Sequence, residues 1–222
     1  MIRLKIFGKS NIGLYLRATN SFVIYHSSIP SEKVALIENE LKVTPVPVNL
    51  VNARIVSPFI AGNKSGAVIS HILEETAKEE LVKELKKIGV NVSILKDKYT
   101  SLGNLVLAND KGAIVSPVVS ARSRRVIADT LDVEVAVTTI GYLSYIGSLA
   151  VANSSGAIIS PLVKDEEKEV IEQVLKVNVV TGTVNKGSDA VALGIVVNDK
   201  GIVVSYSMTA KELLLLSQAF NL

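Results

Sequence analysis

The sequence has 222 residues, 48% of them hydrophobic and 20% charged, and its 24 lysines and arginines barely outnumber its 21 aspartates and glutamates. This balance argues against the broad cationic surface on which nucleic-acid affinity rests, so we expect no DNA partner. The absence of cysteine excludes disulfides, thiolate metal sites and thiol catalysis.

The chain opens with "MIRLKIFGKS", whose alternating residues from Ile2 predict a short strand. This stretch lacks the apolar run of a signal peptide, and no later run approaches the ~18–20 apolar residues that cross a bilayer. We therefore expect a cytoplasmic protein with no membrane contact.

A first structural unit follows from Ile12. It comprises a strand, a turn at residues 20–21, a second strand, a helix over residues 31–41 with an apolar face, and an alternating strand from Val43. This order of strand, strand, helix and strand recurs along the rest of the chain.

An Asn-x-x-Gly turn marks each of the four later units. The turns read "NKSGAVIS", "NDKGAIVSP", "NSSGAIISP" and "NDKGIVVS", and they begin at Asn63, Asn109, Asn153 and Asn198. Their spacings of 46, 44 and 45 residues indicate a repeat architecture. Because β-branched runs flank each turn, we predict hairpins in which Asn and Gly provide the positive φ of a tight return.

A helix is predicted after each of these hairpins, over residues 74–88, 120–131 and 165–175 and from Thr209. Thr209-x-x-Glu212 has the spacing of a capping box, which favours a helix start there. Further alternating strands begin at Val90, Val133 and Val177, but no strand follows the last helix.

The strand from Ile2 can complete the fifth unit, beside residues 201–206, and close a ring, which also removes open sheet edges. The predicted fold class is therefore α/β, with five pseudo-symmetric strand–strand–helix–strand units. Each unit has about 44 residues, and residues 1–222 form one domain. This architecture resembles the pentein β/α-propeller.

The best-known pentein enzymes modify guanidino groups, and the resemblance implies a cysteine nucleophile that this chain lacks. The two histidines, His26 and His71, fall in different units without a nucleophile beside them. We therefore predict no catalytic residues, no metal site and no cofactor. Two alternatives stay open: a guanidine-modifying enzyme, which the missing cysteine disfavours, and a module that binds a small ligand in the central channel.

The stretch "GTVNKGSDAVALGIVVND", residues 182–199, closely resembles archaeal members of the translation initiation factor six family, the ribosome anti-association factors. Supporting stretches are "SLGNLVLAND" from Ser101 and "NIGLYLRATN" from Asn11. The resemblance implies a monomeric, non-enzymatic protein that binds the large ribosomal subunit on its intersubunit face. The implied contacts are ribosomal protein uL14 and the neighbourhood of the sarcin–ricin loop of the rRNA, where the bound protein blocks the small subunit.

Equivalent loops of a ring lie on one face, so we expect the segments between units to form the binding surface. These segments are residues 8–12, 52–57, 98–104, 141–147 and 185–189. Asn104 also matches a position in the binding face of the family. The candidate ribosome-binding residues are Asn11, Ile12, Tyr15, Arg54, Leu102, Asn104, Tyr145, Asn185 and Lys186.

Overall fold

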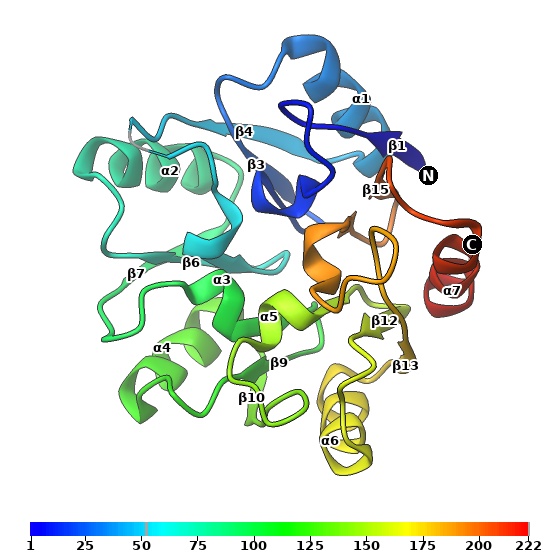
Figure 1. The fold of residues 1–222 in the computed structure, drawn as a ribbon. Coiled ribbons are helices and arrows are strands. Elements are labelled where there is room, and N and C mark those ends of the chain that lie inside the picture. The colour runs from blue at the N-terminus through cyan, green and yellow to red at the C-terminus, as the bar shows by residue number, and fades with distance from the viewer. Residues whose placement is uncertain (52, 222) are drawn as a thin grey trace.

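The computed structural model describes residues 1–51 and 53–221 and arranges them as five three-stranded sheets around a central axis (Figure 1). In each sheet the middle strand pairs antiparallel with an inner strand and parallel with an outer strand. The sheets, each written from inner to outer strand, are β2 (Leu16–Ala18), β3 (Phe22–His26) and β4 (Thr44–Val48); β5 (Ile60–Gly62), β6 (Gly66–Ser70) and β7 (Asn91–Leu95); β8 (Val106–Ala108), β9 (Gly112–Val115) and β10 (Glu134–Val137); β11 (Ala150–Ala152), β12 (Gly156–Ile159) and β13 (Asn178–Thr181); and β14 (Ile195–Val197), β15 (Ile202–Ser205) and β1 (Ile2–Leu4).

Five long helices lie around the outside of the ring (Figure 1). They are α1 (Ser31–Leu41), α2 (Glu75–Lys87), α4 (Ala121–Leu131), α6 (Asp165–Leu175) and α7 (Ala210–Phe220). Each helix contacts the sheet of the preceding unit, so that α2 packs on β4, α4 on β6 and β7, and α1 on β15. On α2, Leu81 and Leu85 are fully buried at such a boundary.

The N-terminal strand completes the fifth sheet. The sequence predicts this pairing, because no strand follows the last helix. β1 runs parallel to β15, with Ile2 opposite Val203 and Leu4 opposite Ser205. Leu4 and Ile6 are buried in one apolar cluster with residues of the first and fifth units. The first and the last strand of the chain are thereby joined in one sheet (Figure 1), and the predicted five-unit pentein ring is confirmed.

The repeated asparagine turns out to connect neighbouring units. Oδ1 of Asn109 accepts hydrogen bonds from the N–H groups of Lys111 and Gly112, at 2.9 and 3.0 Å. Its Nδ2 donates to the carbonyls of Asn153 and Leu175 in the next unit, at 3.0 and 2.9 Å. One side chain therefore closes its own turn and binds both the next turn and the end of the next helix.

The same connection is repeated around most of the ring. Asn63 donates to the next turn and helix end, Asn198 does so to the first unit, and Asn153 donates to the carbonyl of Asn198. Thr19 stands at the equivalent position of the first unit, where its hydroxyl accepts from the N–H of Ser21 and Phe22. The boundary between the first and second units therefore lacks the asparagine connection.

These contacts correct the reason that we expected for the Asn-x-x-Gly pattern, which was a positive φ at Asn and Gly. The four asparagines and four glycines all belong to the described residues, and none of them has positive φ. A Cβ on Gly112 would lie 2.2 Å from the carbonyl oxygen of Val174, and one on Gly156 would lie 1.7 Å from that of Ala219. Glycine is required in each turn because the helix of the next unit ends against it. The repeat period therefore reflects contacts between units.

We expect Asn109→Ala to lower the free energy of unfolding by about 2–4 kcal/mol, because it leaves buried carbonyl and N–H groups without partners. Denaturant unfolding measures this change. Lys111→Ala is the matched control: its Nζ bonds to Ser154 O and Lys176 O are solvent-exposed, so its loss should stay below about 1 kcal/mol. Equal losses in the two variants would contradict the proposed connection.

Candidate functional site

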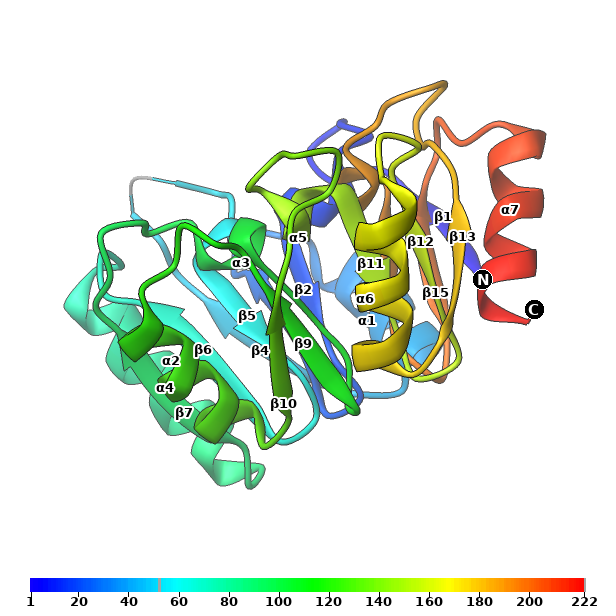
Figure 2. The same ribbon diagram turned by 90° about the horizontal axis from the view of Figure 1, so that it is seen from below.

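Five short helices precede the inner strands and gather at one end of the ring. They are η1 (Ile12–Leu14), η2 (Ser57–Phe59), α3 (Leu102–Leu105), α5 (Ile146–Leu149) and η3 (Val191–Leu193), and each contacts its two neighbours. This contact is close: a Cβ on Gly147 would lie 2.3 Å from the carbonyl oxygen of Gly103. We call this end of the ring the loop face, defined by residues 5–15, 53–59, 97–105, 139–149, 183–193 and 206. The hairpin turns lie at the opposite end (Figure 2).

Two of the predicted binding residues are part of the core. Ile12 and Leu102 are 0% and 1% exposed and pack in separate apolar clusters. Their predicted role is corrected accordingly: they support the loop face from below and offer no side chain to a partner. The segment predicted over residues 52–57 also includes Asn52, which lies outside the described residues.

Two predicted asparagines from opposite ends of the chain meet on the loop face. Nδ2 of Asn185 donates to Oδ1 of Asn11 at 3.3 Å and to the carbonyl of Ser10 at 3.5 Å. Lys186 follows with positive φ and an exposed side chain. Units five and one therefore share a polar contact surface there.

Tyr15 and Arg54 are joined through Phe7, which the sequence reading did not select. The rings of Phe7 and Tyr15 meet edge to face with centroids 5.2 Å apart, and the Arg54 guanidinium lies 4.9 Å from the Phe7 centroid. Phe7 occupies a turn closed by hydrogen bonds between Ile6 and Lys9, with φ of 50°. A bulky residue with positive φ is uncommon, but this backbone state could not be read from the sequence.

Asn104 and Tyr145 belong to the adjacent short helices α3 and α5. Asn104 is half-buried within α3, whereas Tyr145, just before α5, is 46% exposed. Close to Tyr145 in sequence stands Tyr142, which is 75% exposed and was not predicted. The stretch "GYLSY" from Gly141 could have indicated this exposure, because aromatic residues in a polar loop are less often buried than those in a strand or helix.

Lysines accompany the exposed tyrosines. Nζ of Lys164 lies 5.5 Å from the ring centroid of Tyr142, within the range of a cation–π contact. Tyr99 and Tyr206 have the same arrangement with Lys98 and Lys5, at 5.5 and 5.2 Å. The loop face therefore presents aromatic area beside positive charge, a combination suited to both protein and RNA surfaces.

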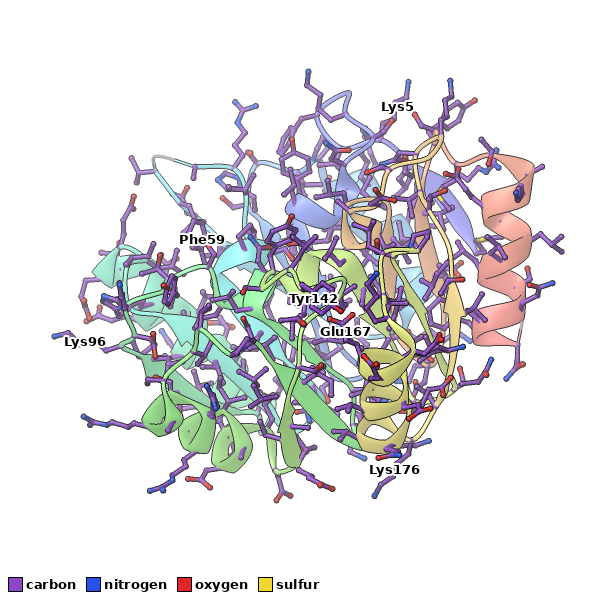
Figure 3. The ribbon with its side chains drawn as sticks, turned by 60° about the horizontal axis from the view of Figure 1, so that its bottom comes forward. Lys5, Phe59, Lys96, Tyr142, Glu167 and Lys176 are labelled. Carbon is purple, nitrogen blue, oxygen red and sulfur yellow. The ribbon has the colours of Figure 1, made fainter. Side chains whose placement is uncertain are left out.

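A buried carboxylate holds the loop that carries Tyr142. Glu167, in the first turn of α6, accepts from the N–H groups of Gly141 and Tyr142 at 2.6 and 3.0 Å, from Lys164 N, and from the Thr139 hydroxyl. Figure 3 shows Glu167 beside Tyr142 at one end of the helix, with Lys176 at the other. The position of the exposed Tyr142 is thus set by a carboxylate that is itself buried.

The equivalent carboxylate of the fifth unit has the same role. Glu212 accepts from the N–H groups of Gly187 and Thr209, at 2.9 and 2.8 Å, and from Lys186 N at 3.3 Å. In the third unit Asp97 accepts from Tyr99 N and Ser120 N, both at 3.2 Å. Three of the loops are therefore fixed to helix starts by carboxylates.

These contacts lower the pKa of all three acids. Burial alone raises each pKa, but hydrogen bonds from hydroxyl and N–H groups to the charged form outweigh it, and they lower the pKa of Asp97 to about 2. A carboxyl whose pKa is lower in the folded state stabilises the fold above its unfolded pKa. This contribution is lost as the pH falls through the folded value.

We therefore expect the thermal midpoint to fall as the pH drops below about 4.3, the usual pKa of a glutamate. The double variant Glu167→Gln/Glu212→Gln should have a lower midpoint at pH 7 and a flatter profile in acid, because an amide places a donor against the loop N–H groups. Calorimetry between pH 2 and pH 7 measures both profiles. Parallel curves for the two proteins would show that these carboxylates do not carry the acid sensitivity.

Within the described residues no three His, Cys, Asp or Glu side chains gather in a group that could hold a metal ion. His26 accepts from the N–H of Ser28, and the ring of His71 lies 3.3 Å from the carbonyl of Leu95. Both histidines are thus engaged with the backbone of their own units. None of the described helices has the length and apolar character needed to cross a bilayer.

Comparisons with known proteins agree along the full chain. The eIF-6 family model matches residues 1–219. Translation initiation factor 6 of Pyrobaculum arsenaticum is 34% identical over 221 residues, which cover 100% of this chain and 99% of the relative. Translation initiation factor 6 of Cenarchaeum symbiosum is 37% identical over 215 residues, which cover 97% of this chain and 96% of the relative.

A solved structure supports the fold alone. A crystal structure of a dimethylarginine dimethylaminohydrolase adduct with S-methyl-L-thiocitrulline matches with a TM-score of 0.55 at 12% identity, covering 79% of this chain and 70% of the enzyme. That enzyme has a pentein fold, which agrees with the five-unit ring predicted from the repeat.

Proposed function

Because this chain belongs to the eIF-6 family of translation initiation factors, we propose that it binds the large ribosomal subunit on its intersubunit face and prevents joining of the small subunit. Its loop face would contact ribosomal protein uL14 and rRNA near the sarcin–ricin loop. We propose that it acts as a monomer in the cytoplasm, during initiation and subunit biogenesis.

Family membership over residues 1–219 is the observation that carries this proposal. The loop face adds support because it combines exposed tyrosines with lysine and arginine side chains. Aromatic residues and arginine are enriched at interface hot spots. Charge at the edge of an interface mainly speeds encounter, so binding should weaken with salt.

A steric block requires a binder that keeps its shape. The asparagine connections join successive turns at one end of the ring, and the short helices contact one another at the other end. The loops between them are fixed by Glu167, Glu212 and Asp97. A preorganised face of this kind loses little conformational entropy on binding.

The alternatives fit the residues less well. The guanidine-modifying reaction of pentein enzymes requires a thiol, and the chain contains no cysteine. The axial cavity measures about 60 Å³, far below the 300–1,000 Å³ of typical ligand pockets. It therefore does not favour a module for organic ligands.

Subunit joining tests the proposal directly. Separated archaeal subunits are mixed under joining conditions, with or without the purified protein, and resolved on a sucrose gradient. We expect the yield of joined ribosomes to fall as protein is added before mixing, with saturation near one protein per large subunit. An unchanged yield at saturating protein would refute the anti-association role.

A further inference from the structure

The axis of the ring holds a small cavity with one charged side chain. The cavity has a volume of about 60 Å³, several times the space that a single water molecule needs. Inner strands and short helices line it with small residues such as Gly62, Gly147 and Ala150, and Arg17 is the charged residue among them.

The equivalent positions of the five units show that this arginine is unusual. Arg17 is the middle residue of inner strand β2. The middle residues of the other four inner strands are Ala61, Leu107, Val151 and Val196. Four units thus place an apolar side chain where the first unit places a cation.

The Arg17 guanidinium has hydrogen-bond partners for only some of its N–H groups and no ion-pair partner among the described residues. Nη2 of Arg17 donates to the carbonyls of Ser57 and Gly103, at 3.2 and 3.1 Å, but its Nε is buried without a partner. No carboxylate among the described residues forms an ion pair with Arg17. Burial lowers the pKa of Arg17 to about 10, so the guanidinium still carries its charge at neutral pH.

We propose that the axial cavity binds a small monovalent anion, of the size of a halide, beside the guanidinium of Arg17. Arg17 is the one cation among the described residues that line the cavity, which matches a single negative charge. An anion there supplies a counter-charge for this guanidinium and accepts hydrogen bonds from it. This site lies on the axis, apart from the exposed side chains of the loop face.

Sodium bromide is a suitable probe, because bromide can be located by anomalous scattering. In crystals of the unmodified protein soaked in bromide, we expect an anomalous peak on the axis within hydrogen-bonding distance of the Arg17 guanidinium. In solution, bromide should raise the thermal midpoint saturably relative to sodium gluconate at equal ionic strength. Absence of bromide from the cavity would overturn the proposal.

Substitutions separate anion binding from a structural role of the arginine. Arg17→Leu copies the residue of the third unit and should abolish the saturable bromide response, whereas Arg54→Leu should keep it. A lower midpoint for Arg17→Leu with an unchanged bromide response would show that Arg17 only anchors the short helices, and would overturn the site. If Arg17→Leu does not fold, Arg17→Lys keeps the charge without the planar guanidinium and should bind bromide at least about tenfold more weakly. Equal affinity would contradict the proposed contact with the guanidinium.

Discussion

Removal of residues 1–7 should lower the free energy of unfolding of the whole ring by about 4–8 kcal/mol. The deletion removes the buried side chains of Leu4 and Ile6, each contributing about 1.5–3 kcal/mol. It also removes the pairing of β1 with β15, whose hydrogen bonds contribute about 1 kcal/mol each. Because β15 then becomes an open edge, the truncated protein should also aggregate more readily.

Thermal and denaturant unfolding of the truncated protein measure this effect. The matched control is Arg3→Ala/Lys5→Ala, which keeps the strand and alters only exposed side chains. This control should lose less than about 1 kcal/mol. A truncated protein with an unchanged thermal midpoint would show that the N-terminal strand does not hold the ring closed.

The second large effect concerns the loop face. Asn104→Ala should weaken binding to the large subunit by about 1–3 kcal/mol if its partner group is left buried and unpaired. Tyr142→Ala removes a 75% exposed ring and should cost about 2 kcal/mol or more if that ring is a hot spot. The double variant should therefore bind at least about a hundredfold more weakly, since 1.4 kcal/mol corresponds to a factor of ten.

A hairpin-turn variant provides the control for these losses. Lys111→Ala changes an exposed side chain at the opposite end of the ring and should bind the subunit normally. Circular dichroism and thermal midpoints establish that all variants are folded. Loss of binding in Lys111→Ala, with binding retained in Asn104→Ala/Tyr142→Ala, would place the contact surface at the hairpin end.

The sequence predicted the ring because the fold repeats. Apolar side chains at a period of two or about 3.6 residues must face a core, so hairpins and helices followed from pattern alone. Closure by the strand from Ile2 followed from counting strands, and β1 does pair with β15. These features depend on the burial of apolar side chains, which the pattern of apolar residues within each segment predicts.

Contacts between units were harder to predict. The role of Asn109 depends on the carbonyls of Asn153 and Leu175, far along the chain, so the turn itself suggested only local geometry. The burial of Ile12 and Leu102 likewise depends on short helices that carry no long apolar period. Positive φ at Phe7 and Tyr142 follows from turns that tertiary contacts impose.

Co-sedimentation with separated ribosomal subunits is the most direct test of the proposed function. The purified protein is mixed with large or small archaeal subunits and centrifuged through a sucrose cushion at two salt concentrations. We predict that it pellets with the large subunit and not with the small subunit, more weakly at high salt. Recovery in the supernatant with both subunits, or pelleting with the small subunit instead, would contradict the proposed function.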